Sequence, residues 1–258
     1  MNRITKTAFF GSNYKIAQSV HRAVPVSGIY TEEKNFNTDL FNFAKQQNIP
    51  FFIIHTLSDL DALCSSNPEL AVMYGTGLIM KQKQIDSFQH GIWNIHPGKL
   101  PSYRGRHPIS WALINNEPDI GLCIHQINTQ IDQGVLLASI DLPRDMNDTQ
   151  NDMDRKINTA FEQGFFEQAL ENYYQGNCET LSEGEYHESL VSKFASIDPS
   201  EHTGPFVFNL FKSQFSFGGV VVEGTRYTSC DFYYEAKKDH YPNGKVFECG
   251  NGDKIILH

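Results

Sequence analysis

Short apolar runs alternate with amphipathic segments along the first part of the chain. The continuous apolar runs are typical of strands buried on both faces of a sheet, and they occupy residues 7–10, 24–30, 51–54 and 70–74. Helical spacing of apolar residues separates these runs over 14–20 and near 38–47. Strands that alternate with helices predict an α/β fold with a doubly wound, mostly parallel sheet, which binds ligands at the carboxyl ends of its strands.

Residues 11–13, Gly-Ser-Asn, lie between the first strand and the first helix. Such a turn can hold a phosphate on the backbone N–H groups of a helix N-terminus. It is also an ordinary strand-to-helix connection, with Ser12 or Asn13 as the N-cap. The full glycine fingerprint of dinucleotide-binding proteins is absent. We therefore favour the simple turn and infer no NAD binding.

Apolar residues recur at largely helical spacing through residues 146–174, with acids and amides between them. This pattern predicts one long amphipathic helix that is capped near Asp148 or Thr149 and packs on the sheet.

The chain changes character after about Leu181. An aromatic, apolar segment is followed by short β-rich runs, which together occupy residues 206–217, 218–222, 231–234, 245–249 and 254–257. The turn sequences at 241–244 and 250–253 are typical of hairpins. We expect two domains, an α/β domain over residues 1–181 and a small β-rich appendage over residues 182–258.

The composition is that of a globular chain. Hydrophobic residues make up 40% and charged residues 20%, and no apolar run approaches the length of a membrane span. The first residues do not open into a signal-peptide core. A net charge of −9 argues against nucleic acid as a partner, although Lys99, Arg104 and Arg106 are compatible with one small phosphorylated substrate. Scattered cysteines without metal-ligand spacing predict free thiols in the cytoplasm, at positions 64, 123, 178, 230 and 249.

Asn94 and His96 are the strongest candidates for chemistry. They stand two residues apart after an apolar lead-in, so a strand would point both side chains to one face, and Pro97 would end that strand. Asp132, beside a turn glycine, can orient such an imidazole. An amide that holds an oxyanion, a base and its orienting acid form an acyl-transfer site without a protein nucleophile. Taken alone, Asn-x-His is more often turn chemistry or a satisfied polar cluster.

The order of the whole segment resembles the folate-dependent formyltransferase family. That family carries Asn-x-His-Pro-x-x-Leu-Pro-x-Tyr-Arg-Gly, then a Gly-x-Thr-x-His strand, then an Asp-x-Gly loop. The matching residues here are 94–105, 121–125 and 132–134, and about residues 72–137 align in order. The resemblance implies a Rossmann-like formyltransferase core.

Two departures from the family pattern lie close to these residues. Gly98-Lys99 stands where the family commonly has Ser-Leu, and Leu122-Cys123 replaces Val-Thr. Neither changes Asn94, His96 or Asp132, but both could alter which amine is admitted.

The resemblance also implies a reaction. N10-formyltetrahydrofolate is the formyl donor, and no metal is required. His96 is the candidate base, Asp132 holds its ring in one tautomer, and the Asn94 amide donates to the developing oxyanion, a contact of a type typically worth ~3 kcal/mol of barrier. The folate pterin is expected in an apolar slot formed by Leu78, Ile79, Met80, Ile127, Gln130 and Asp132.

The modest tail is most similar to that of sugar N-formyltransferases. We expect the acceptor to be a dTDP- or UDP-linked amino-dideoxy sugar, formylated for O-antigen, lipopolysaccharide or another surface polysaccharide, with Lys99, Tyr103 and Arg104 on the substrate. The alternatives are a methionyl-tRNA or glycinamide ribonucleotide formyltransferase, or a catalytically silent module that binds folate or nucleotide sugar.

We also expect a homodimer whose interface is formed mainly by residues after about Leu181. The competing possibility is a monomer.

Other polar and aromatic residues receive structural interpretations. His125 lies within a strand pattern, which favours a packed, hydrogen-bonded support for the site. His107 precedes Pro108 at a helix entry, which favours a capping or surface role. Phe217 and Tyr227 could stack on a base, although most aromatic residues of the tail are expected in the core.

Overall fold

The computed structural model describes residues 3–56, 59, 67–214, 217–235 and 240–258. The chain forms two compact units. Unit 1 comprises Met1–Pro101, Gly121–Ile140 and Lys156–Gly184, and unit 2 comprises Ser102–Ile120, Asp141–Arg155 and Glu185–His258. Unit 2 therefore includes two stretches from within residues 1–181. The domain boundaries expected from the sequence stay a prediction.

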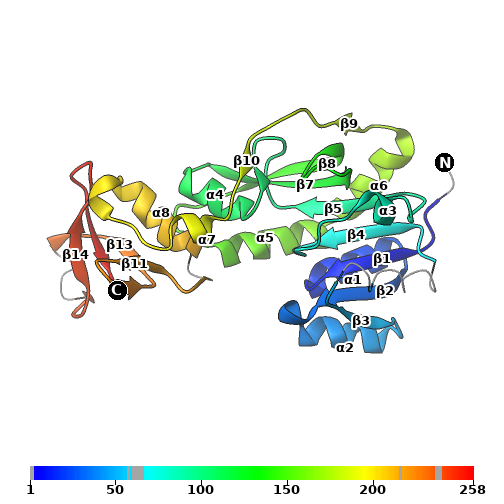
Figure 1. Ribbon diagram of the computed structural model, residues 1–258, viewed down its shortest axis with the longest axis horizontal. Helices are drawn as coiled ribbons and strands as arrows, with labels where there is room; N and C mark the ends of the chain where they lie inside the picture. The colour runs from blue at the N-terminus through cyan, green and yellow to red at the C-terminus, as the bar shows by residue number, and fades with distance from the viewer. Residues whose placement is uncertain (1–2, 57–58, 60–66, 215–216, 236–239) are drawn as a thin grey trace. The chain divides into compact units, whose positions relative to one another are not determined.

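Unit 1 is built on an eight-stranded sheet with the order β3-β2-β1-β4-β5-β7-β8-β9 (Figure 1). The first five of these strands in this order are parallel, whereas β5 pairs with β7, and β8 with β9, in antiparallel fashion. The predicted doubly wound, mostly parallel α/β sheet is confirmed. The strands are β1 (Thr7–Gly11), β2 (Val26–Glu32), β3 (Phe51–Ile54), β4 (Leu70–Tyr74), β5 (Ile92–His96), β7 (Asp119–Ile127), β8 (Gly134–Pro143) and β9 (Glu179–Thr180).

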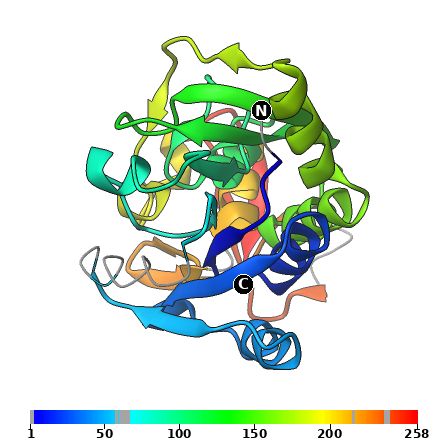
Figure 2. The same cartoon turned by 90° about the vertical axis from the view of Figure 1, so that its right-hand side faces the viewer.

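Three helices of unit 1 pack together beside this sheet. Helix α1 (Tyr14–Ala23) contacts both α2 (Thr38–Gln46) and α6 (Phe165–Gln175) (Figure 2). Asn13 is the N-cap of α1, and its side-chain oxygen accepts a hydrogen bond from the Ile16 N–H at 3.1 Å. The predicted N-cap is therefore confirmed at Asn13. Two short helical turns also belong to this unit, η1 (Glu33–Asn35) and α3 (Gln82–Ile85).

The predicted single helix over residues 146–174 is wrong. The segment forms α5 (Gln150–Glu162) and α6, and Gly164 separates them with a φ of 100°. Glycine adopts this left-handed backbone without steric cost, so it can end one helix and open the next. The start of α5 is confirmed at Thr149, whose N–H and hydroxyl both donate to the Asp152 carboxylate.

Unit 2 combines short helices with small sheets. Helices α4 (Pro108–Ile114) and α8 (Gly204–Gln214) pack against each other, so the aromatic segment at 206–217 is mainly helical over its described residues. The remaining elements are β6 (Arg104–Gly105) paired with β10 (Tyr186–His187), β11 (Val220–Val222) paired with β12 (Thr225–Tyr227), the sheet β13-β15-β14 (Cys230–Phe232, Lys254–Leu257, Lys245–Glu248), α7 (Leu190–Lys193) and η3 (Pro199–Glu201). The β-rich character expected of the tail is confirmed.

One of the two predicted hairpins is correct. Residues 250–253 join the antiparallel neighbours β14 and β15. Residues 241–244 do form a turn, with the Gly244 N–H donating to the Tyr241 carbonyl at 2.9 Å. However, β13 and β14 each pair with β15 rather than with each other, so this turn is not a hairpin. The residues of a turn can identify the turn, but they do not determine whether the strands on its two sides pair with each other.

None of the helices in the described part of the chain combines the length and the apolar character needed to cross a bilayer. The described cysteines are free thiols, with Cys123, Cys230 and Cys249 buried and Cys178 partly buried. Cys64 lies outside the described residues.

Candidate active site

Strand β5 places Asn94 and His96 at its carboxyl end, as the sequence predicts. The two residues are separated by one position, so their side chains leave the strand on the same face. Strand β5 ends at His96, directly before Pro97, which has no N–H for a further ladder bond. The amide and the imidazole are therefore positioned by the central part of the sheet, between β4 and β7.

Asp132 reaches the same place from the loop between β7 and β8. Its φ is 49°, in the left-handed region that aspartate tolerates better than most residues. Gly134 follows with a φ of 116°, and a Cβ atom there would lie 2.1 Å from the Gln126 carbonyl oxygen. Glycine is required at this position, because any side chain would displace the loop that carries the carboxylate.

The three predicted catalytic side chains converge. Asp132 Oδ1 lies 3.5 Å from His96 Nδ1 and 3.4 Å from Asn94 Nδ2. Only 5% of the His96 side chain and 11% of the Asp132 side chain are exposed. Burial strengthens the electrostatic interaction between an imidazolium and a carboxylate. The group can therefore stabilise a transient positive charge on His96 and orient its ring.

His125 supports this arrangement from the neighbouring strand. It stands opposite Asn94 in the antiparallel pairing of β5 and β7, and its ring is fully buried. His125 Nδ1 lies 3.1 Å from the Gln133 carbonyl, and its Nε2 lies 3.2 Å from Asn94 Nδ2. A carbonyl can only accept, so we assign the proton to Nδ1, and Nε2 then accepts from the Asn94 amide. The expected packed, hydrogen-bonded histidine is observed.

We expect His125 to make the protein's stability depend on pH. Burial, followed by the charge of His96, lowers the pKa of His125 from 6.5 to about 4. Between these values the unfolded chain binds a proton that the folded chain does not, so the free energy of unfolding should fall as pH drops from 6.5 toward 4, by roughly 3 kcal/mol for this group. Urea unfolding of the wild type and of His125→Asn at several pH values measures this, and equal slopes in the two proteins would refute it.

The residues predicted for folate binding are partly gathered. Leu78 and Ile127 both pack against one buried cluster that includes Met80. Ile79 is 61% exposed, and Gln130 lies on the exposed part of the Asp132 loop. Two separate loops therefore present a mixed apolar and polar surface of the kind that a pterin ring requires. Their role in folate binding stays a prediction.

Glu32 contacts the loop that precedes the residues predicted for folate binding, a contact that was not predicted from the sequence. Its carboxylate accepts from the Gly77 N–H at 2.9 Å and pairs with Lys34 Nζ at 3.0 Å. Burial raises the pKa of Glu32, but the Gly77 hydrogen bond and Lys34 outweigh it and hold the pKa below its usual value. The bond holds the start of the loop that leads to Leu78. An acidic residue at the carboxyl end of the second strand was the available signal.

The residues predicted for substrate binding have different surroundings. Lys99 is exposed in unit 1. Tyr103 is buried in unit 2, where its hydroxyl donates to Glu117 at 2.5 Å, and burial with this hydrogen bond raises its pKa to about 12. Arg104 lies in β6, half-buried and paired with β10. The hydroxyl of Tyr103 is thus committed to an internal bond, and the substrate contacts of all three residues stay predictions.

His107 occupies the N-cap of α4 with a φ of 56°, but its side chain makes no capping hydrogen bond. Instead its ring lies against Phe217, with 4.9 Å between ring centroids. Tyr227 makes an edge contact with Phe247, with 6.0 Å between ring centroids. These aromatic residues have packing partners within unit 2, and any stacking on a nucleotide base stays a prediction.

Comparison with known proteins identifies the domain. Residues 44–169 match the family model described as Formyl transferase. The chain therefore contains a formyl transferase domain, and the predicted resemblance is confirmed. A methionyl-tRNA formyltransferase from Ehrlichia canis (strain Jake) is 32% identical over 124 residues, which are 46% of this chain and 41% of that protein. The alignment thus spans less than half of this curated relative.

Solved structures match the fold over almost the whole chain. The N-formyltransferase from Helicobacter canadensis, in complex with folinic acid and dTDP-3-aminofucose, has a TM-score of 0.73 at 16% identity over 99% of both chains. WlaRD, a sugar 3N-formyl transferase with dTDP and 5-N-formyl-THF, has a TM-score of 0.71 at 17% identity over 100% of this chain and 98% of that one. At these identities the likeness establishes the fold.

Proposed function

We propose that this protein transfers a formyl group from N10-formyltetrahydrofolate to the amine of a nucleotide-linked amino sugar. The main support is the fold agreement over both units with sugar N-formyltransferases, two of which were solved with a formylated folate and dTDP or a dTDP-linked sugar. The convergence of Asn94, His96 and Asp132 supplies the chemistry. A cytoplasmic location, a dideoxy sugar linked to dTDP or UDP, and a place in surface polysaccharide synthesis belong to the same proposal.

His96 serves as the base in this mechanism. The neutral amine of the sugar attacks the formyl carbon, and the carbonyl π electrons move onto oxygen. His96 accepts the proton released by the amine, and Asp132, 3.5 Å from Nδ1, stabilises the imidazolium. The intermediate then collapses, the bond between the formyl carbon and N10 breaks, and His96 returns the proton to N10. One formyl group is transferred, and the base is regenerated.

Asn94 serves as the oxyanion donor. One of its two amide hydrogens is directed to His125 Nε2 at 3.2 Å, and the other faces Asp132 Oδ1 at a longer 3.4 Å. The shorter bond fixes the orientation of the amide. His125 Nε2 can accept this bond because the ring proton is on Nδ1, which donates to the Gln133 carbonyl. The second hydrogen, whose contact with Asp132 is the longer one, is the donor that remains available to a developing oxyanion.

The competing acceptor is methionyl-tRNA, the substrate given in the name of the relative from Ehrlichia canis. That relative aligns over only 46% of this chain. The net charge of −9 also disfavours tRNA, since affinity for nucleic acid depends mainly on Lys and Arg contacts to phosphates.

We expect formylation of a nucleotide-linked amino sugar and no useful formylation of methionyl-tRNA. The protein is incubated with N10-formyltetrahydrofolate and a panel of dTDP- and UDP-linked amino sugars, and products are read by a mass increase of one formyl group. The parallel reaction contains initiator methionyl-tRNA at low and high salt. Salt-sensitive transfer to methionine, with no product from any sugar, would assign the protein to tRNA instead.

We expect the full chain to be a homodimer held mainly by residues after about Leu181. The short strands of unit 2 leave backbone edges that a second copy can pair with. Light scattering at micromolar concentration measures the mass of the full chain and of a chain cut near Leu181. A monomeric full chain contradicts the dimer, and a truncated chain that still dimerises places the interface elsewhere.

A further inference from the structure

The loop that follows β4 is bonded to a carboxylate from β2, although β1 lies between these two strands in the sheet. Glu32 is the last residue of β2. It accepts hydrogen bonds from the Gly77 N–H at 2.9 Å and from the Thr76 hydroxyl at 3.4 Å. Only 16% of the Glu32 side chain is exposed, and a hydrogen bond to a charged acceptor is roughly twice as strong as a neutral one. Glu32 therefore ties this loop to the end of β2.

The contact continues through Thr76 to Leu78. The Leu78 N–H donates to the Thr76 hydroxyl oxygen at 3.2 Å, and the same hydroxyl donates to Glu32. A hydroxyl can donate one hydrogen bond and accept others, so Thr76 connects the carboxylate to the Leu78 backbone. The Leu78 side chain packs against the buried cluster that includes Met80. The backbone conformation of residues 76–78 therefore depends on Glu32.

The carboxylate is oriented by residues of η1, which directly follows Glu32. Lys34 Nζ lies 3.0 Å from Oε1, and Asn35 Nδ2 donates to Oε2 at 3.2 Å. The bonds from Gly77 and Thr76 both reach Oε2. One oxygen is thus paired mainly with Lys34, and the other is directed to the loop.

The loop begins beside the candidate active site. Strand β4 pairs with β5, and Tyr74, the last residue of β4, stands beside Ile95. Ile95 directly precedes His96. Ligands of such sheets bind at the carboxyl ends of the strands. Residues 75–79 are therefore placed to contact a ligand that reaches His96.

We propose that Glu32 is a positioning residue for the formyl donor. Its carboxylate holds residues 76–78 in the conformation in which Leu78 and the 61% exposed Ile79 contact the bound folate. The identity of this ligand rests on the proposed function, whereas the hydrogen bonds do not. The candidate catalytic residues lie on β5 and in the loop before β8, so Glu32 should affect the affinity for the donor and not the rate of the chemical step.

Glu32→Ala is expected to weaken binding of 5-N-formyl-THF by about tenfold or more, because hydrogen bonds to a charged group are lost. Calorimetric titration of the full chain measures this affinity, and kcat at saturating donor should equal that of the wild type. Glu32→Gln keeps a carbonyl oxygen that can accept from Gly77, so it should retain most of the affinity. Glu33→Ala is the matched control, because the side chain of Glu33 is 79% exposed and pairs with His55. It should bind as the wild type does.

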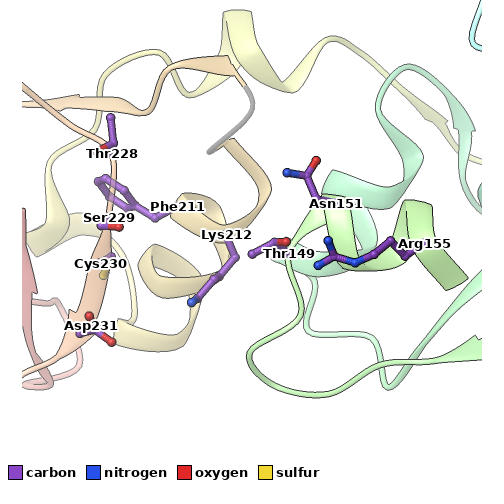
Figure 3. A pocket seen from close by; sticks show the side chains of 9 residues that line it. All are labelled: Thr149, Asn151, Arg155, Phe211, Lys212, Thr228, Ser229, Cys230 and Asp231. Atoms are coloured by element: carbon purple, nitrogen blue, oxygen red, sulfur yellow. The ribbon is translucent and has the colours of Figure 1, made fainter. Parts of the chain in front are cut away.

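Amide hydrogen exchange measures the order of the loop without any ligand. In Glu32→Ala, the Gly77 and Leu78 amides should exchange about tenfold or more faster, because both lose the support of the carboxylate. Thr76→Val removes only the hydroxyl, so it should accelerate exchange at Leu78 and leave Gly77 unchanged. Thr228→Val is the matched control and should change neither rate. Thr228 lines a cavity of about 250 Å³ in unit 2 (Figure 3), and none of the residues lining that cavity contributes to the hydrogen bonds around Glu32.

The proposal is overturned if Glu32→Ala binds 5-N-formyl-THF as tightly as the wild type, or if its loss appears in kcat with unchanged affinity. Wild-type exchange of both amides in Glu32→Ala would also overturn it. Should Glu32→Ala fail to fold, Thr76→Val decides, since wild-type exchange at Leu78 in that variant would refute the connection through the hydroxyl. A wild type that binds no formylated folate would contradict both the proposed function and the ligand named here, whereas unchanged exchange with intact folate binding would contradict the role of Glu32 alone.

Discussion

Replacing His96 by Asn is expected to lower kcat by about 10²–10⁴-fold and to leave the fold intact. Asn is smaller than His and retains polar atoms, so the buried position at the end of β5 stays filled and near Asp132. The variant lacks a group that can accept the amine's proton near neutral pH. Turnover is followed by mass spectrometry, and donor binding is followed by calorimetry.

His55→Asn is the matched control for this substitution. His55 is in the same unit, but 62% of its side chain is exposed and it lies outside the group around Asp132. We expect its turnover to equal that of the wild type. Asp132→Asn should resemble His96→Asn, because an amide cannot stabilise the imidazolium. Near-wild-type turnover in either His96→Asn or Asp132→Asn would refute the mechanism in which His96 is the base and Asp132 stabilises it.

Asn94→Ala is expected to lower kcat by about 10²–10³-fold with a much smaller effect on KM. The substitution removes the donor that faces the developing oxyanion, and an interaction made only in the transition state affects turnover rather than substrate binding. It also leaves His125 Nε2 without the donor that lies 3.2 Å away, so some loss of stability should accompany it.

Steady-state kinetics with thermal unfolding of the same samples separate these two effects. Asn177→Ala is the control, because this exposed amide lies after α6 and contacts Gln175 rather than the candidate active site. We expect it to retain wild-type kcat. An Asn94→Ala variant whose loss appears only in KM would show that the amide binds the ground state and does not stabilise an oxyanion.

Local sequence patterns predicted most of unit 1. The strands at 7–10, 51–54 and 70–74 and the helix near 38–47 correspond to β1, β3, β4 and α2. The burial expected of β1 and β4 is observed, because burial on both faces requires continuous apolar runs, and helical spacing marks the one buried face of α2. The burial expected of β3 is wrong, since it is the edge strand and Phe52 and Ile53 are 43% and 38% exposed. The break at Gly164 was missed because helical periodicity continues on both sides of it.

The pairing of strands in unit 2 was not predictable in the same way. Turn residues identified reversals near 241–244 and 250–253, but β15 pairs with both β13 and β14. The last strand, β15, thus lies between β13 and β14, which the turn sequence alone would have paired with each other. Such pairing depends on contacts between distant segments, which no short window of sequence contains.

The candidate active site shows the same division between sequence and tertiary structure. The sequence alone determined that Asn94 and His96 share one face of a strand ended by Pro97, because strand geometry and proline chemistry are local properties. Only the tertiary structure brought Asp132 to 3.5 Å from His96 and placed His125 opposite Asn94. These contacts join Asn94 of β5 to residues 31 and 38 positions along the chain, and they depend on the packing of β7 beside β5.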